Sequence, residues 1–435
     1  MIPRPPAVER TLLEPLVEST NDSSVAIVLG ARATGKTTLL LHAIRELITR
    51  GTVLPEDIYY FDLDTMDCGD VLASNRSLLN YLGITPGEDC RNKIAVIDEV
   101  QRLPNPGLFL KSVHDLHLPL KLMVTGSSSL ELRSRIRESL ADRRMTFYLW
   151  TFSPREWMGY CGLEVSDALD AYMSWGGYPS VAMEPDPARK SGLLTELLRA
   201  YMDRDIESFL RVERMDAFGQ MLRILARQAG QLVNLNEIAG TLKISHDTAR
   251  RYLSFLQETF VIGIAPPFFR NLRSELTKMP KAFFTDLGLR NLLAGELRPG
   301  RTTAGAVAES FVYTALLNMV GTDAIRYWRT EGKAEVDFVI EKPGELIPVE
   351  VKAGAMGRAK IPTGLRSFIK AYQPGTAIVL NATLDATTAV GTTKVRFVSR
   401  ERWLDELELQ VAGRVLGKER AKQTGREAPI KNPVE

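Results

Sequence analysis

A short glycine-containing segment near the amino terminus carries the clearest chemistry of this 435-residue chain. It fills the spacing G-x-x-x-x-G-K-[ST] at Gly30, Gly35, Lys36 and Thr37. Glycines there let successive backbone N–H groups converge on a phosphate, the lysine places a cation against the β and γ oxygens, and the threonine hydroxyl suits Mg²⁺. We therefore expect ATP and Mg²⁺ to bind at this loop, through Gly30, Ala31, Arg32, Ala33, Thr34, Gly35, Lys36, Thr37 and Thr38.

Two adjacent acids, Asp98 and Glu99, end a second apolar run further along the chain. An acid at the carboxyl end of a strand beside a phosphate loop is placed to hold Mg²⁺, which we assign to Asp98. The neighbouring Glu99 is the natural general base, because it can polarise the water that attacks the γ-phosphate. The acid pair therefore predicts hydrolysis of the nucleotide and not storage alone.

Hydroxyl residues and arginines near the ends of the next two runs are further candidates. Thr125 or Ser127 would lie between the acid pair and the γ-phosphate and sense hydrolysis, with simple turn residues as the alternative. Arg143 and Arg144 are candidates for the arginine that stabilises the charge developing in phosphoryl transfer, from the same or a neighbouring subunit. Ordinary solvated arginines are the alternative.

A second group of charged residues lies in the carboxyl-terminal part of the chain. Asp337 is followed, after a turn, by Glu350-x-Lys352, a spacing that matches the metal-dependent nuclease pattern PD-(D/E)xK. Side chains alternate along a strand, so Glu350 and Lys352 share a face. In a nuclease, Asp337 and Glu350 would bind Mg²⁺, with Glu309 as a further ligand, and Lys352 would orient the attacking water. The alternative is a surface hairpin with ordinary alternating charge.

A helix–turn–helix pattern lies between these two regions. Two helical patterns, 235–242 and 246–256, are separated by a three-residue break, and strand-like runs at 260–264 and 281–285 would form a wing. His246, Arg250 and Arg251 would then lie on the outer face of the second helix, available to DNA. Winged helices also act as protein docking modules or as lids, and the sequence leaves these alternatives open.

The order of apolar runs and helical patterns defines the expected organisation. Short apolar runs alternate with helical patterns up to about residue 150, which is typical of a parallel α/β sheet. A second strand-rich region follows the helical middle of the chain. The predicted domains are an AAA-like ATPase core with a phosphate loop (1–153), a helical lid (154–215), a winged-helix domain (216–290), an α/β PD-(D/E)xK nuclease-like domain (291–410) and a disordered tail (411–435).

Composition limits the class of protein. Apolar residues make up 45% and charged residues 25% of the chain, which is ordinary for a globular protein, and the net charge is only +2. Any basic surface for nucleic acid must therefore be local. The chain has three cysteines, and none of them is in C-x-x-C spacing, which argues against a zinc site or a disulfide framework. This cysteine usage favours a cytoplasmic location. The longest apolar stretch is too short to cross a membrane.

Taken together, the motifs resemble a large prokaryotic family of AAA-like ATP-binding proteins related to the archaeal and STAND ATPases. That family carries a carboxyl-terminal domain of unknown function that is similar to restriction endonucleases. The resemblance covers roughly residues 1–400 and rests on Gly30-Ala-Arg-Ala-Thr-Gly-Lys-Thr-Thr-Leu-Leu40, Ile97-Asp-Glu-Val-Gln101, Thr125-Gly-Ser-Ser128, Gly176-Gly-Tyr-Pro179, Tyr201-Met-Asp-Arg-Asp-Ile206, Phe284-Thr-Asp-Leu-Gly-Leu289, Glu335-Val-Asp-Phe-Val339 and Val349-Glu-Val-Lys352.

The resemblance implies that ATP and Mg²⁺ bind at Gly35, Lys36, Thr37 and Asp98, and that Glu99 is the catalytic acidic residue. One departure concerns Leu140-Ala-Asp-Arg143, where the family pattern reads Leu-Ala-Gly-Arg. The added carboxylate of Asp142 is placed to pair with Arg143, which weakens the case for Arg143 as an arginine finger.

Two functions follow from these expectations. In the first, a Mg²⁺-dependent ATPase uses its nucleotide state to control the winged-helix and nuclease-like region, and hydrolysis releases contacts that hold the helical lid. DNA is then the candidate partner, and a homo-oligomer is an open expectation. In the second, the protein is an ATP-gated regulatory or binding module whose nuclease-like fold is catalytically inactive.

Overall fold

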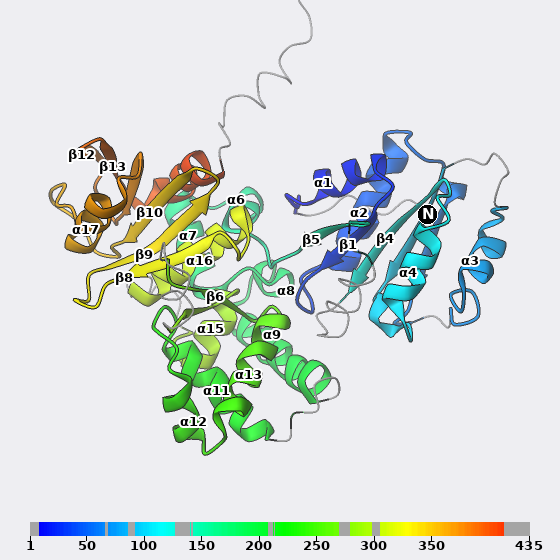
Figure 1. Cartoon of the computed structure of the whole chain (residues 1–435), viewed down its shortest axis with the longest axis horizontal. Coiled ribbons are helices and arrows are strands. Elements are labelled where there is room, and N and C mark those ends of the chain that lie inside the picture. Colours follow the sequence, from blue (N-terminus) through cyan, green and yellow to red (C-terminus); the bar gives the residue numbers. More distant parts are fainter. Residues whose placement is uncertain are drawn as a thin grey trace, which may run out of the picture. The chain divides into compact units, whose positions relative to one another are not determined.

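The computed structural model of the protein describes residues 8–65, 68–85, 92–126, 140, 142–207, 212, 214–268, 279–297 and 305–412 (Figure 1). The chain divides into two compact units. One comprises Met1–Ala265 with Met279–Thr314, and the other comprises Pro266–Lys278 with Ala315–Glu435. The domain boundaries expected at 153, 215 and 290 stay predictions beside this division.

The amino-terminal part of the first unit is built on a five-stranded sheet in the order β2-β3-β4-β1-β5, and every neighbouring pair is parallel. Strand β1, which lies between β4 and β5, reads VAIVL and is buried at all five positions, as expected for a strand covered on both faces. The parallel α/β sheet predicted from the sequence is therefore confirmed. Its strands are β1 (Val25–Leu29), β2 (Ile58–Asp62), β3 (Lys93–Asp98), β4 (Leu120–Gly126) and β5 (Arg144–Tyr148).

Helices supply the apolar side chains that cover this sheet. Leu39, Leu40 and Ala43 of α2 pack with Ala26 and Val28 of β1 in one hydrophobic cluster. The α2 pattern is amphipathic, so burial of one face stabilises both the helix and the strand it covers. The helical elements around the sheet are α1 (Leu13–Glu18), η1 (Ser19–Asn21), α2 (Lys36–Thr49), η2 (Pro55–Asp57), α3 (Asn75–Leu82), η3 (Val100–Arg102) and α4 (Pro106–His114).

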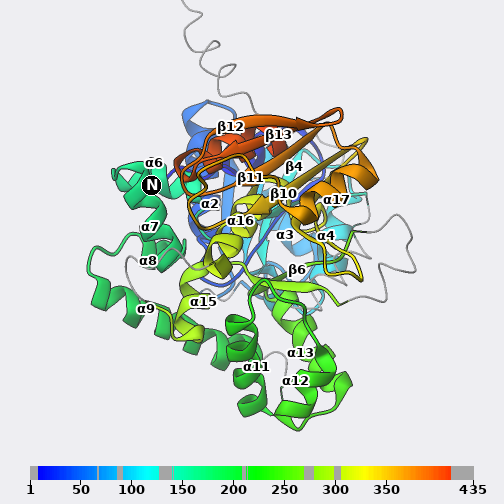
Figure 2. The same ribbon diagram turned by 90° about the vertical axis from the view of Figure 1, so that its left-hand side faces the viewer.

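Helices dominate the rest of the first unit. Figure 2 shows α11, α12 and α13 grouped together, and their apolar faces share one hydrophobic cluster that includes Phe218, Leu242 and Leu256. The elements are α6 (Pro154–Cys161), α7 (Val165–Trp175), α8 (Pro179–Ala182), α9 (Pro187–Ala200), the π-helix η4 (Tyr201–Glu207), α11 (Met215–Arg227), α12 (Leu235–Leu242), α13 (His246–Glu258), β6 (Ile262–Ala265), β7 (Lys281–Phe284), α15 (Leu287–Ala294) and the start of α16 (Gly305–Val320).

The second unit contains a six-stranded sheet in the order β12-β13-β11-β10-β9-β8. Strands β8, β9 and β10 are antiparallel neighbours, whereas β10, β11 and β13 run parallel. Trp328, Phe368 and Phe397 lie in its hydrophobic core. Its elements are β8 (Ile325–Arg329), β9 (Glu335–Lys342), β10 (Glu345–Val351), α17 (Thr363–Tyr372), β11 (Thr376–Leu380), β12 (Ala386–Val390), β13 (Thr393–Val398), η5 (Arg400–Arg402), α18 (Trp403–Leu407) and the π-helix η6 (Glu408–Ala412).

The carboxyl-terminal boundary differs slightly from the expectation. Helical structure continues to Ala412, and Val411 is buried with 1% exposure. A buried apolar residue belongs to a packed unit, so the tail expected from residue 411 begins no earlier than residue 413. The remaining residues of that predicted tail lie outside the described residues.

Two glycine-containing motifs far apart in the sequence meet at a buried junction in the first unit. The Asp286 carboxylate accepts hydrogen bonds from Gly177 N–H (2.8 Å) and from Leu289 N–H (3.0 Å). The Gly177 carbonyl in turn accepts from Phe152 N–H at 2.7 Å, and a Cβ on Gly177 would overlap the Phe152 carbonyl oxygen. Burial raises the pKa of Asp286, while these backbone N–H groups oppose that rise. Asp286 therefore joins the Gly177 segment, which follows α7, to the start of α15.

Asp286→Asn should destabilise the first unit. Both carboxylate oxygens accept backbone hydrogen bonds, and an amide can accept at only one of its two polar atoms, so one buried N–H loses its partner. We expect the free energy of unfolding to fall by about 1–3 kcal/mol, measured by urea denaturation followed by tryptophan fluorescence. The matched control is Glu18→Gln, an exposed site with the same loss of charge; equal stability of the two variants would contradict the role of Asp286.

Candidate nucleotide-binding site

The glycine-containing loop lies between β1 and α2, at the carboxyl end of β1. Gly35 has a φ of 93°, which L side chains rarely adopt, and it directly precedes the first residue of α2. A Cβ on Gly30 would overlap the Leu149 carbonyl oxygen, so the loop can pass β5 only with glycine there. The loop residues therefore converge at the amino-terminal end of a 14-residue helix, whose N–H groups favour an anion.

Lys36 is buried within this loop. Its Nζ donates to the carbonyl oxygens of Gly30 (3.2 Å) and Ala31 (3.1 Å). Thr34 Oγ1 donates to the same Ala31 carbonyl at 2.9 Å and so tightens the turn. The ammonium is thus held inside the curve of the loop, where a phosphate oxygen would compete with the carbonyls for its protons.

Three hydroxyl groups converge on the Asp98 carboxylate, which is only 2% exposed. Thr37 Oγ1 lies 2.6 Å and Tyr60 Oη 2.7 Å from Oδ2, and Thr125 Oγ1 donates to Oδ1. The Thr37 hydroxyl and the Asp98 carboxylate are adjacent hard oxygen donors from the loop and from β3. This donor set fits Mg²⁺, which prefers carboxylate and hydroxyl oxygens and one or two protein ligands beside phosphate.

Tyr60 is a member of this group that the sequence did not reveal. It lies on β2, which neighbours β3. Burial, and then the hydrogen bond to Asp98, raise the pKa of Tyr60, so the hydroxyl stays protonated and donates. Nothing in the motifs pointed to it, because a motif does not state which strand lies beside which.

Glu99 follows Asp98 in an unusual backbone conformation. Its φ of 59° and ψ of 48° are left-handed, which is uncommon for a residue with a long side chain. Its N–H donates to Thr125 Oγ1 at 2.9 Å, and Gln101 Nε2 donates to its carboxylate. Thr125 therefore links the two acids, and it is completely buried. The alternative candidate Ser127 lies outside the described residues.

Arg143 and Arg144 lie at the other end of the sheet from the loop. The Arg143 carbonyl accepts from Val25 N–H at 2.9 Å, and Arg144 is in register with Val25, the first residue of β1. The loop begins after the last residue of β1, about 13 Å further along. Arg143 therefore cannot reach the phosphate loop of its own chain, and a role in a neighbouring subunit stays a prediction. The expected pairing with Asp142 is wrong, because Arg143 Nε pairs with Asp115 at 2.9 Å.

Asp337 and Glu350 lie on the adjacent strands β9 and β10 of the second unit. Val349 is in register with Phe338, so the next pair in the ladder brings Glu350 opposite Asp337. Asp337 Oδ2 accepts from Val351 N–H at 2.8 Å, and Lys352 Nζ lies 2.6 Å from Glu350 Oε1. The Glu350 side chain is 6% exposed and that of Lys352 is 45% exposed. The three residues therefore form a compact charged cluster.

Glu309 belongs to the first unit, and a Cβ on Gly230 would lie 2.9 Å from its Oε2. Within the described residues, no group of three or more His, Cys, Asp and Glu side chains is arranged to hold a metal ion. The role of Glu309 as a further metal ligand beside Asp337 and Glu350 stays a prediction.

The helix–turn–helix region presents cationic side chains on one helix. α12 and α13 are joined by Lys243–Ser245, and Ser245 caps α13 by accepting from Thr248 N–H at 3.0 Å. Arg250 and Arg251 are exposed, and His246 is partly exposed. The expected strand pair is present as antiparallel β6 and β7.

Among the described residues, helices fall short of the length and apolar character needed to cross a bilayer.

Family models match three consecutive parts of the chain. An AAA domain matches residues 22–158, a domain of unknown function (DUF8612) matches 166–299, and another domain of unknown function (DUF4143) matches 304–397. This is an AAA-like ATP-binding protein with a carboxyl-terminal domain of unknown function. The AAA match contains the loop, Asp98 and Glu99, so an ATPase-type P-loop domain carries the candidate site.

The similar curated proteins have no described function. Uncharacterized proteins of Mycobacterium bovis and Mycobacterium tuberculosis are each 29% identical over 272 residues, which is 60% of this chain and 58% of each relative. An uncharacterized protein of Methanocaldococcus jannaschii is 20% identical over 73% of this chain and 72% of its own length. The alignment thus spans less than two thirds of the mycobacterial proteins.

Solved structures give only distant likenesses to this AAA-like protein. The ORC2 protein of Aeropyrum pernix, solved as ADPNP and ADP complexes, is 12% identical over 68% of this chain and 95% of its own, with a TM-score of 0.41. The Bacillus subtilis DNA clamp loader delta protein is 11% identical over 57% of this chain and 88% of its own, with a TM-score of 0.27. These scores are too low to support a conclusion about function.

Tyr60→Phe tests the role of the Tyr60 hydroxyl that donates to the Asp98 carboxylate. Because the phenol donates to Oδ2 beside Thr37, its loss should loosen the carboxylate and lower kcat/KM for ATP roughly tenfold. Tyr59→Phe is the matched control, since the Tyr59 hydroxyl faces Lys93 at 3.3 Å. A steady-state phosphate-release assay checks the pair, and equal rates for both variants would remove Tyr60 from the site.

Proposed function

We propose that this protein binds ATP with Mg²⁺ and hydrolyses it, and that its nucleotide state controls the helix–turn–helix and nuclease-like regions. The observation that carries the first part is the convergence of Thr37 and Thr125 on Asp98, with Glu99 bound to the same Thr125. A loop threonine, a strand acid and a neighbouring acid are the parts that phosphoryl transfer to water requires. They come from separate segments of the AAA domain.

Each residue has a task in this proposal. Lys36 exchanges its two carbonyl partners for phosphate oxygens, and Thr37 and Asp98 hold Mg²⁺, which neutralises charge on the phosphates. Glu99 orients and polarises the attacking water, and the Thr125 bond keeps its backbone in the left-handed conformation. Arg143 is left to act on the site of a neighbouring subunit, which is the basis for proposing a homo-oligomer.

DNA is the proposed partner of the remaining regions. Exposed Arg250 and Arg251 on α13 can contact phosphates or base edges. The segment before α12 supports a winged-helix interpretation, because Leu232 forms an isolated antiparallel bridge with Lys281, the first residue of β7. In the second unit, the antiparallel strands β8, β9 and β10 are followed by α17 and the parallel strand β11, and this mixed α/β order supports the nuclease-like interpretation.

A binding module without cleavage is the second candidate. The Lys352 ammonium lies 2.6 Å from Glu350 Oε1, so it competes with a metal ion for a carboxylate oxygen that nuclease chemistry would use. Such a region would bind nucleic acid or protein under ATP control and leave it uncut. The two candidates share the ATPase and differ in the second unit.

The ATPase part is tested by Lys36→Ala and Glu99→Gln. Removing the ammonium should weaken ATP binding about 10- to 100-fold, because charge-assisted hydrogen bonds to phosphate are lost. Glu99→Gln should bind ATP normally and lower kcat at least about 100-fold, because the general base is gone. Lys111→Ala on α4 is the control for the lysine change. Wild-type turnover by Glu99→Gln would rule out its catalytic role.

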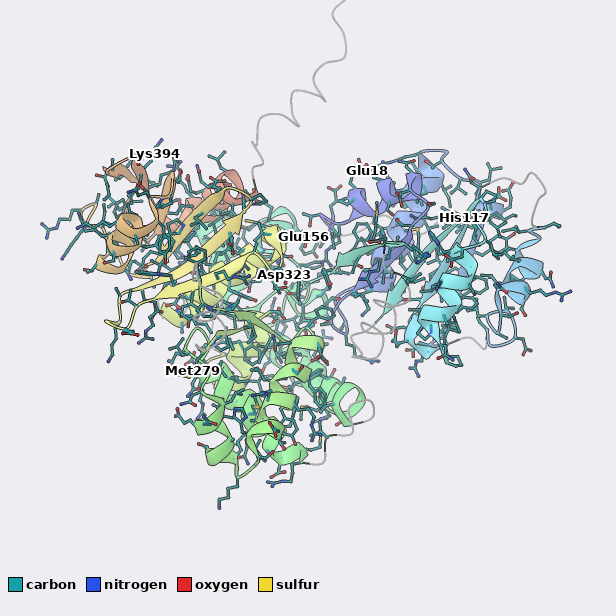
Figure 3. All side chains as sticks on the ribbon, in the orientation of Figure 1. Glu18, His117, Glu156, Met279, Asp323 and Lys394 are labelled. Atoms are coloured by element: carbon teal, nitrogen blue, oxygen red, sulfur yellow. The ribbon has the colours of Figure 1, made fainter. Side chains whose placement is uncertain are left out.

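Cleavage is tested by incubating the protein with plasmid, single-stranded DNA and RNA, with Mg²⁺ or Mn²⁺, with and without ATP. If the second unit is a nuclease, Asp337→Ala, Glu350→Ala and Lys352→Ala should each abolish cleavage because metal binding or water activation is lost. Lys394→Ala, an exposed site on β13 of the same sheet (Figure 3), should retain it. ATPase activity without cleavage under any condition would favour the binding module.

A further inference from the structure

We propose that Arg10 is a positioning residue that couples the phosphate loop to the first helix after the sheet, α6, through Glu156. The inference rests on the proposed nucleotide binding at that loop. Arg10 precedes α1 and lies outside all the motifs that the sequence singled out. Its side chain is 7% exposed, which is unusual for an arginine without a structural or functional task.

The Arg10 guanidinium bridges two backbone segments that belong to different parts of the AAA domain. One terminal nitrogen, Nη1, donates to the Thr34 carbonyl of the phosphate loop at 2.9 Å. The other, Nη2, donates to the Trp150 carbonyl beyond β5 at 2.7 Å, and the guanidinium lies 5.0 Å from the centre of the Phe152 ring. A planar guanidinium presents its two terminal nitrogens to the two carbonyls at a fixed spacing, whereas a lysine ammonium is a single centre that would have to lie within reach of both.

The third contact of Arg10 reaches α6. Its Nε lies 3.2 Å from Glu156 Oε1, and the Glu156 side chain is 3% exposed. Glu156 lies in the first turn of α6 and completes a capping box: its Oε2 accepts from Ser153 N–H at 2.8 Å, and Ser153 Oγ accepts from Glu156 N–H at 3.1 Å (Figure 3). Its Oε1 also accepts from Thr11 N–H at 2.7 Å. The same carboxylate therefore anchors Arg10 and starts α6.

Through these contacts, the position of the phosphate loop and the position of the first turn of α6 depend on each other. A phosphate that draws the loop N–H groups toward itself reorients the Thr34 carbonyl, and Arg10 must follow it or lose a buried hydrogen bond. Movement of Arg10 pulls on Glu156 and on Trp150. From there the chain continues to Phe152, whose N–H donates to Gly177, and Gly177 donates to Asp286 at the start of α15. The route ends beside the helix–turn–helix region of the same unit.

Hydrogen exchange of the full chain tests the coupling. The wild type, Arg10→Gln and Arg10→Lys are compared with and without the β,γ-imido analogue of ATP and Mg²⁺. In the wild type, the analogue should slow exchange at least about fivefold in both 30–38 and 153–161. Both variants should keep the slowing at 30–38 and lose it at 153–161. Arg10→Lys preserves the charge beside Glu156, so it guards against a variant that merely fails to fold.

Arg50→Gln is the matched control, because this exposed arginine pairs with Glu14 and Glu46. It should behave like the wild type. Slowing at 153–161 that persists in Arg10→Lys would overturn the coupling, as would slowing confined to 30–38 in the wild type. An analogue that slows neither segment of the wild type would overturn the proposed nucleotide binding as well, which distinguishes the two failures.

Discussion

The buried carboxylate of Asp98 is the constraint on which the candidate site depends. A carboxylate that is 2% exposed is costly to bury unless hydrogen bonds replace water. Here Thr37, Tyr60 and Thr125 supply three hydroxyl donors from the loop helix and from the strands on either side of β3. Satisfying this one charge therefore fixes the phosphate loop, β2 and β4 relative to β3.

Close backbone packing fixes the remaining geometry of the first unit. The loop passes the Leu149 carbonyl at Gly30, and the Phe152 carbonyl passes Gly177 in the same way. Arg10 then ties the Thr34 carbonyl to Trp150 and Glu156. The two glycine contacts hold backbone against backbone, and the buried Arg10 guanidinium is fixed by two carbonyls and a carboxylate. A change at the loop is therefore transmitted with little loss through side-chain rotation.

The strands were largely predictable, because those buried on both faces read as continuous apolar runs. β12 shows no such run, because it is an edge strand of mostly small and polar residues, with no position fully buried. At the site, the loop, Asp98 and Glu99 were found from local spacing, whereas Tyr60 and Arg10 belong to no local pattern. The expected pairing of Arg143 with Asp142 was wrong for a related reason: Asp142 is the neighbour of Arg143 in sequence, but Asp115 is its neighbour in space.

The sequence by itself determined which groups can do chemistry: a phosphate loop, an acid pair after a strand, and the Asp337, Glu350 and Lys352 set. Those assignments depend on backbone conformation and spacing within a few residues, which local sequence encodes. Only the tertiary structure decided which partners these groups have. It brought Tyr60 to Asp98, joined Gly177 to Asp286 and moved Arg143 to the opposite end of the sheet. Strand order and close packing set such contacts, and they depend on the whole core.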